Sequence, residues 1–235
     1  MGAGFYVLKT IKTGFERTCY KYLREPKTQH PEPILKMANI GLSELRHRLD
    51  EAITYADTSV AEGLVGEGLR ISREREMPAE EMYFKAQREI LEGNYSDAIV
   101  YLDSAIKLNP KDGAAYNDRA LCMVELGITD AALPYFDRGI ESEPDYSTIY
   151  HNKGWLLNKL GEYKRAVALF KKALEIEPGR AVTYENLADA YFNLGLKQEA
   201  LAALRKALQF LPPSCPEIRE QIEAGIKTLT SGCRS

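Results

Sequence analysis

The sequence predicts an all-α protein built as an array of helix–turn–helix repeats, because three residue types recur at one fixed spacing. Glycine, alanine and proline each return every 34 residues over four consecutive units, and the three series stay in register. Apolar residues between these marks follow the three- and four-residue steps of a helix. The series are Gly93, Gly127, Gly161 and Gly195; Ala98, Ala132, Ala166 and Ala200; and Pro110, Pro144, Pro178 and Pro212.

Each mark has a physical role within a unit. Glycine reaches the left-handed conformation that commonly ends a helix, so we expect it to close the first helix. Proline cannot continue a helix, so we expect it after the second one. Alanine is small enough for two helices to cross closely. Pro134 falls just inside a second helix and is expected to remove one backbone hydrogen bond there. The predicted units are residues 79–112, 113–146, 147–180 and 181–214.

The residues before the first unit divide into two segments. Residues 1–33 are predicted to hold an amphipathic helix over Phe5–Leu23 and then a linker with three prolines. Residues 34–78 are predicted to be helical and could include a degenerate fifth repeat, with Ser59 and Glu62 forming a capping box. Three interpretations stay open for the first 60 residues: a helical hairpin that caps the array, an arm that binds a partner or forms dimers, and a basic helix that binds a membrane surface weakly.

The residues after the last unit, 215–235, are predicted to form a capping helix and a tail. Four apolar residues, Ile218, Ile222, Ile226 and Leu229, lie on one stripe of this segment. A stacked array leaves an apolar face exposed at its end, and a terminal helix with one polar face shields it from water.

The pattern resembles the tetratricopeptide repeat, a helix–turn–helix unit of 34 residues, over Ala79–Ser214. An aromatic slot early in the first helix of that family corresponds here to Met82, Tyr116, Tyr150 and Tyr184. A later aromatic or apolar slot corresponds to Glu89, Met123, Leu157 and Tyr191, so the first unit departs from the pattern at Glu89. The resemblance implies a right-handed superhelical array in which the first helices line a concave groove.

The resemblance also implies which residues line that groove. An asparagine amide can pair with both sides of a peptide backbone, so Asn152 and Asn186 could form a ladder for an extended chain, or could be solvated surface residues. Trp155, the only tryptophan, could anchor a ligand or pack between neighbouring helices. The predicted groove residues are Tyr83, Phe84, Gln87, Asn117, Asp118, Leu121, His151, Asn152, Trp155, Glu185, Asn186 and Asp189.

The charges of the chain and of its predicted groove indicate that the partner is a protein or peptide rather than a nucleic acid. The net charge of the chain is −3, and the predicted groove is mostly acidic, which disfavours a nucleic-acid phosphate backbone and favours a neutral or basic peptide. The family's carboxylate clamp for Hsp70 and Hsp90 C-terminal tails needs lysine and arginine at groove positions where this chain has none, so these tails are not expected as partners. The acidic residues expected to line the groove are Glu80, Asp118, Glu125, Glu185 and Asp189.

The sequence therefore predicts an adaptor that holds an extended peptide of a partner protein in the groove. The alternative is an oligomeric assembly factor or scaffold that self-associates through its N-terminal helical arm and could be peripheral to a membrane. No catalytic residues, metal site or cofactor are expected, because the three histidines and four cysteines form no catalytic or metal-ligand pattern. No apolar run reaches the ~18 residues of a membrane span, so we expect a cytoplasmic protein, with peripheral membrane association left open.

Overall fold

A computed structural model describes residues 41–55 and 57–231, in which there are eleven α-helices and no strand. The predicted helix Phe5–Leu23 and the linker after it lie outside the described residues. The described chain divides into two compact units, which we call the N-terminal unit (residues 41–143) and the C-terminal unit (residues 144–231). None of the described helices is both long enough and apolar enough to cross a membrane.

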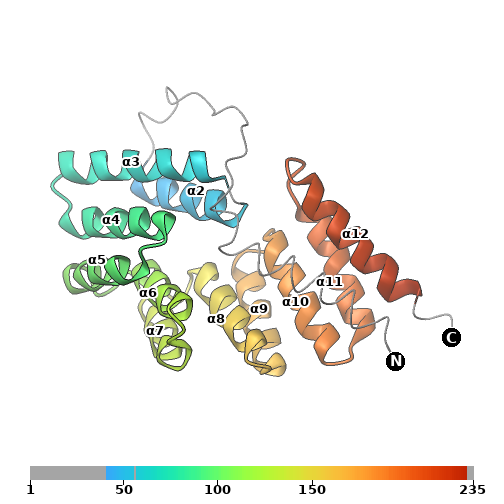
Figure 1. The fold of residues 1–235 in the computed structure, drawn as a ribbon. Helices are drawn as coiled ribbons and strands as arrows, with labels where there is room; N and C mark the ends of the chain where they lie inside the picture. The colour runs from blue at the N-terminus through green and yellow to red at the C-terminus, as the bar shows by residue number, and fades with distance from the viewer. Residues whose placement is uncertain (1–40, 56, 232–235) are drawn as a thin grey trace. The chain divides into compact units, whose positions relative to one another are not determined.

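In the N-terminal unit, consecutive helices pack against one another, from α2 to α7 (Figure 1). Pro78 opens α4, where its missing N–H costs no helical hydrogen bond. The helices are α2 (Leu42–Thr54), α3 (Thr58–Glu74), α4 (Pro78–Glu92), α5 (Tyr95–Leu108), α6 (Gly113–Glu125) and α7 (Thr129–Ser142).

The C-terminal unit continues the alternation of first and second helices. Each helix packs against the next, and α8 also contacts α10, so the first helices of successive repeats lie side by side. The helices are α8 (Ser147–Lys159), α9 (Tyr163–Ile176), α10 (Ala181–Asn193), α11 (Lys197–Phe210) and α12 (Pro216–Ser231).

The four repeated glycines end the first helices as predicted. Gly93, Gly127, Gly161 and Gly195 have φ angles of 80, 78, 82 and 78°, in the left-handed region that side chains disfavour. The residue after each glycine donates a backbone hydrogen bond to the carbonyl five positions earlier, as Asn94 does to Glu89 at 2.8 Å. This pattern satisfies carbonyls that the helix end would otherwise leave unpaired.

The repeated small residues lie in the core, also as predicted. Ala98, Ala132, Ala166 and Ala200 are each 0% exposed, so these positions have no room for a larger side chain. Pro134 lies inside α7, and the helix continues past it to Ser142. At the other end of the array, α12 packs on α11 and buries Ile222, which confirms the predicted capping helix.

The start of α3 differs from the prediction. The N-cap is Asp57, whose Oδ1 accepts a hydrogen bond of 3.1 Å from the Val60 N–H, and Ser59 lies within the helix. The predicted capping box of Ser59 and Glu62 is therefore wrong, because the Asp57 carboxylate, two residues earlier, is the group that caps the helix by accepting from one of its free N–H groups. Where a degenerate repeat was predicted, α2 and α3 form a helix pair that packs on α4 through α3.

Candidate functional site

The predicted groove residues lie on α4 and α6 in the N-terminal unit and on α8 and α10 in the C-terminal unit. The structure brings them together as two separate clusters, one in each unit. Most of their side chains are buried, including Tyr83, Gln87, Asn117, His151, Asn152, Trp155 and Asn186. Asp118, Glu185 and Asp189 are partly exposed. Phe84, which is fully buried, packs against α3 close to Gly68, and Leu121 is buried on α6.

In the N-terminal cluster, the polar groups satisfy one another. The Gln87 side-chain amide donates to one oxygen of Asp118, and the Asn117 amide donates to the other at 2.9 Å. Burial raises the pKa of Asp118 to about 6, although hydrogen bonds from Asn117, Gln87 and Tyr83 act in the opposite direction. These contacts engage both oxygens of the carboxylate within the protein.

Arg46 of α2 joins this cluster, which the sequence analysis missed. Its guanidinium donates to both oxygens of Asp112 at 2.9 and 2.8 Å and to Glu80 at 3.1 Å, and lies 3.6 Å from the centre of the Tyr83 ring. A signal for the pair with Glu80 exists in the sequence: Arg46 and Glu80 are opposite charges one repeat length, 34 residues, apart. The Arg46 side chain therefore covers the face of the Tyr83 ring that the sequence analysis had assigned to a ligand.

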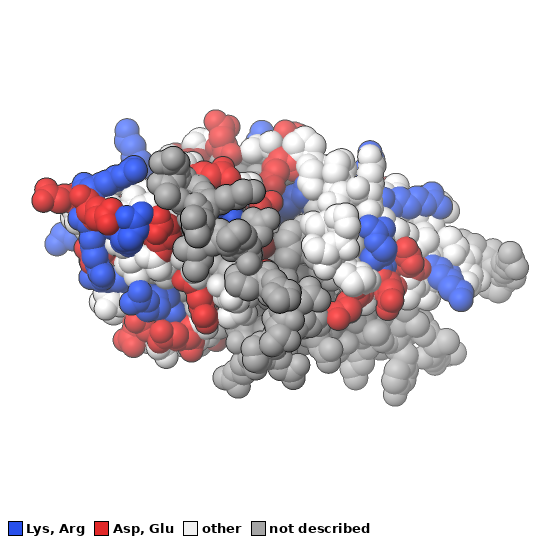
Figure 2. Space-filling model, turned by 90° about the horizontal axis from the view of Figure 1, so that it is seen from above, with Lys and Arg blue, Asp and Glu red and all other residues white. Residues whose placement is uncertain are grey.

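The helix pair α2–α3 also carries both signs of charge on its surface. Figure 2 shows Lys and Arg side chains interspersed with Asp and Glu over α3, so no extended field of one sign is present there. Arg70 forms ion pairs with Glu67 and Glu74, and Arg73 forms one with Glu81. Exposed pairs of this kind contribute little to stability or to the recognition of a charged partner.

In the C-terminal cluster, His151 is held as a neutral imidazole. Burial lowers its pKa well below 6.5, and the nearby Arg180 lowers it further. The His151 Nδ1 lies 2.9 Å from the Thr183 hydroxyl, and Nε2 lies 3.4 Å from the Asn186 amide nitrogen. Since the Asn186 amide is a donor, Nε2 accepts, and the ring proton on Nδ1 is donated to Thr183. The ring therefore ties α8 to α10 without adding a positive charge.

Three polar atoms on α8 and α10 are buried and have no hydrogen-bond partner in the part of the chain that the structure describes. They are the Trp155 indole Nε1 and the side-chain oxygens of Asn158 and Asn186. The Asn186 amide nitrogen donates to the Val182 carbonyl at 3.1 Å, and that of Asn158 donates to Asp189 at 2.7 Å, which fixes both amide orientations. A buried group left without a partner costs about 1–3 kcal/mol.

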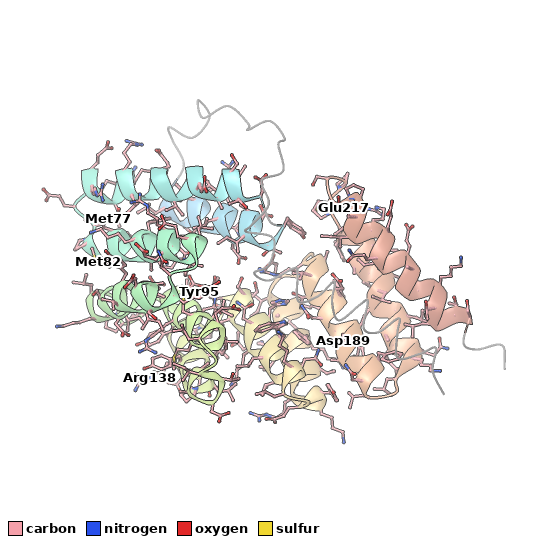
Figure 3. All side chains as sticks on the ribbon, in the orientation of Figure 1. Met77, Met82, Tyr95, Arg138, Asp189 and Glu217 are labelled. Carbon is pink, nitrogen blue, oxygen red and sulfur yellow. The ribbon has the colours of Figure 1, made fainter. Side chains whose placement is uncertain are left out.

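Two neighbouring carboxylates, Glu185 and Asp189, lie on α10. Asp189 projects from α10 (Figure 3), where it accepts from Asn158 and Asn193. Burial raises the pKa of Glu185 to about 7, and the negative charge of Asp189 contributes to the rise. The cation nearest to Trp155 is Lys159, whose ammonium lies 4.4 Å from the centre of the indole ring.

The raised pKa of Glu185 predicts a pH-dependent effect of Glu185→Gln on stability. Between about pH 4.5 and 7 the folded protein binds more protons at this carboxyl than the unfolded chain, so stability falls as the pH rises through that window. Glutamine removes this cost. We expect the melting temperature of the variant to match that of the parent near pH 4.5 and to exceed it at pH 8 by about 2–4 °C, the shift given by roughly 1 kcal/mol.

Thermal unfolding monitored by circular dichroism at both pH values measures this effect. Glu220→Gln is the matched control, because Glu220 is exposed on α12, and the same change of charge there should leave the difference independent of pH. If the two variants raised the melting temperature equally at pH 8, burial and the charge of Asp189 would not be what destabilises ionised Glu185.

The repeated helix pairs, the glycine-ended first helices and the aligned side chains on α8 and α10 define a helical-repeat protein. The chain belongs to the tetratricopeptide repeat family, whose sequence model matches residues 89–153 and 157–220, more than half of the chain. The resemblance seen in the sequence is thereby confirmed. A search of curated proteins finds no match to the sequence.

Solved structures with the same fold have low sequence identity to this chain. A thermophilic tetratricopeptide repeat protein of Thermus thermophilus, TTC0263, is 20% identical with a TM-score of 0.61, covering 79% of this chain and 98% of its own. YrrB, described as a tetratricopeptide repeat protein with an unusual peptide-binding site, is 18% identical with a TM-score of 0.53, covering 82% and 95%. MamA is 23% identical with a TM-score of 0.52, covering 69% and 93%. At these identities the similarity establishes the fold alone.

Proposed function

We propose that this protein is an adaptor whose C-terminal unit binds an extended, neutral or basic peptide of a partner protein along α8 and α10. The observation that carries the proposal is the set of three buried polar atoms without a partner in the described residues, on Trp155, Asn158 and Asn186. We call these three residues, together with Glu185 and Asp189, the peptide site.

The unpaired atoms match what a peptide backbone offers. An extended chain presents alternating carbonyl oxygens and N–H groups. The Trp155 N–H can donate to a carbonyl, and the oxygens of Asn158 and Asn186 can accept from N–H groups. These atoms are shielded from water, so a peptide reaches them only when the groups that cover them move aside, and the hydrogen bond it then makes removes the cost of an unpaired group.

The charges of the peptide site favour a basic or neutral ligand over an acidic one. Asp189 is close enough to Glu185 for its negative charge to raise the pKa of the Glu185 carboxyl. A ligand cation between the two carboxylates would stabilise both in the ionised form. Neutral His151 adds no opposing charge. The Lys159 ammonium lies against the Trp155 ring, where it holds the indole in place by a cation–π contact.

The N-terminal cluster is a weaker candidate for the same role. Its amides are engaged with Asp118, and Arg46 covers Tyr83. A partner peptide would have to break these contacts before it made its own. The presence of a peptide-binding site in YrrB, which shares the fold, is consistent with a site of this kind on the array.

Replacing Trp155 with phenylalanine tests the backbone interaction, because it removes the indole N–H and keeps an aromatic ring. A library of random 12-residue peptides displayed on phage is selected on the immobilised full chain, and one enriched peptide is labelled for fluorescence anisotropy. We expect enriched sequences with net positive charge, and a Kd for Trp155→Phe about tenfold higher than for the parent, the effect of about 1.4 kcal/mol.

Tyr163→Phe is the matched control, since Tyr163 lies at the start of α9, outside the peptide site, and the change also removes one polar donor. Asn186→Ala is less informative: the Asn186 amide also bonds Val182 and His151, so stability would fall along with affinity. Enriched peptides that bind Trp155→Phe as tightly as the parent would overturn the backbone role of this residue. A selection without enrichment would overturn the adaptor function.

A further inference from the structure

We propose that copies of this chain associate through two different surfaces, the exposed side of α9 and α11 on one copy and the exposed side of α5 and α7 on the next. We call the first surface, in the C-terminal unit, the basic face, and the second, in the N-terminal unit, the acidic face. This inference goes beyond the proposed function and is independent of it, because the peptide site lies on the first helices α8 and α10.

The exposed charges of the two faces are opposite in sign. On α9 and α11 the exposed residues include seven cations and two carboxylates, with Lys171 and Arg205 among the cations. On α5 and α7 the exposed residues include five carboxylates and two cations, with Asp97 and Glu141 among the carboxylates. Opposite potentials of this kind attract two surfaces and orient them as they meet.

The sign of the charge changes at equivalent positions of the repeats. Four exposed residues follow one another at the 34-residue spacing on the four second helices: Asp103, Asp137, Lys171 and Arg205. The repeat places these residues on the same side of their helices. The two faces therefore share one spacing of charges and differ in sign.

An apolar position lies within each face, three residues before the charges of that series. It holds Val100 and Pro134 on the acidic face, and Ala168 and Ala202 on the basic face, all of them exposed. Val100 is 63% exposed, so its side chain projects from α5. Alanine leaves space between long lysine and arginine side chains, which a projecting valine can fill. An apolar centre with a charged rim is the usual composition of a protein–protein contact.

The packing of the helices makes the two faces alike in shape. In the N-terminal unit α5 and α7 both pack on α6, and in the C-terminal unit α9 and α11 both pack on α10. Each face is therefore formed by two second helices that share one first helix. The contact uses each unit as it stands, without any rearrangement inside it.

A second copy suits these faces better than another anionic partner does. A lipid surface or a nucleic acid would satisfy the basic face alone, whereas a second copy supplies a partner for both faces. Because the two surfaces in contact are different, each pair still presents one unused face of each sign. Further copies can therefore add to the pair.

Two of the charges are already engaged within the chain. Asp103 forms an ion pair with Arg119, and Lys172 forms one with Glu175. Exposed pairs such as Lys172 with Glu175 contribute little and exchange readily. The test below therefore changes other residues of the two faces.

Sedimentation velocity of the full chain measures the association. For the parent we expect a mass that rises with concentration at about 0.02 M salt and returns to that of one chain at about 0.5 M, because salt screens exposed charges. Lys171→Glu/Arg205→Glu reverses the basic face, and Asp97→Lys/Glu141→Lys reverses the acidic face. We expect each variant to self-associate at least about tenfold more weakly than the parent.

Mixing the two variants should restore association, because one then presents two acidic faces and the other two basic faces. Arg88→Glu/Lys111→Glu is the matched control. Both residues are exposed and lie outside the two faces, and this variant has the same net charge as Lys171→Glu/Arg205→Glu. It should self-associate as the parent does, which separates an effect of the face from an effect of net charge.

Each remaining outcome contradicts the proposal. A parent that stays a single chain at low salt would overturn it, and binding of phosphatidylserine vesicles by that single chain would assign the basic face to a membrane surface. Equal association of the parent and both face variants would place the contact elsewhere. A mixture that does not associate would show that the two faces do not meet. The adaptor function is judged separately, by the peptide selection and by Trp155→Phe.

Discussion

Replacing Arg46 with methionine is expected to lower the free energy of unfolding by roughly 3–5 kcal/mol at pH 7, because it removes one partner of a largely buried ion cluster. Asp112 would lose two hydrogen bonds while its side chain stays only 3% exposed, and Glu80 would lose one. Burial already raises the pKa of Glu80 above its ordinary value with Arg46 in place. Urea unfolding of parent and variant measures the difference.

Two further measurements identify the cause of that loss. Arg46→Met/Asp112→Asn should recover much of it, since asparagine leaves no buried charge and can still cap α6, where Asp112 accepts from the Ala115 N–H. The deficit of the single variant should also shrink as the pH falls, because burial raises the pKa of Glu80 and protonation then neutralises this stranded carboxylate. A loss below about 1 kcal/mol at pH 7 would show that water replaces the guanidinium, as it does at exposed pairs.

Gly68→Ala is expected to destabilise the protein by roughly 1–3 kcal/mol, although alanine is the better helix former. A Cβ at this position of α3 would lie 2.4 Å from the Phe84 ring of α4, well inside contact distance. Phe84 is 0% exposed and has little room to move away. The measured quantity is again the free energy of unfolding in urea.

Gly66→Ala is the control for this effect, two residues away on the same helix. A Cβ there meets nothing within 4 Å, so alanine should stabilise the helix by about 0.5–1 kcal/mol. The two substitutions are chemically identical and are expected to differ in sign. If both stabilise the protein, the close packing of α3 on α4 is contradicted.

The array could be predicted from the sequence because its signals are local and repeated. The first helices α6, α8 and α10 begin at Gly113, Ser147 and Ala181, which preserves the 34-residue period read from glycine, alanine and proline. Each mark acts on its own backbone or on the helix beside it. A left-handed glycine ends a helix whatever the rest of the chain does, so the four units follow from the pattern alone.

The details of the site could not be read in the same way, because they depend on which neighbour each side chain meets. Asp118 and Asn186 occupy equivalent positions in their repeats, yet Asp118 accepts from Gln87 while the Asn186 amide turns back to Val182. Arg46 and Asp112 are 66 residues apart, and no repeat length connects them. Such pairings depend on side-chain geometry and burial, and the 34-residue spacing of the sequence pattern carries no information about either.

The contacts of α2 and α3 with the rest of the N-terminal unit bear on how the protein can be shortened for experiment. A fragment that begins at Ala79, where the first 34-residue unit starts, would strip Gly68 from the Phe84 ring and take the guanidinium away from Asp112. We expect such a fragment to aggregate or to express poorly. A fragment that begins at Gly41 retains both contacts and is the better starting point for crystallisation.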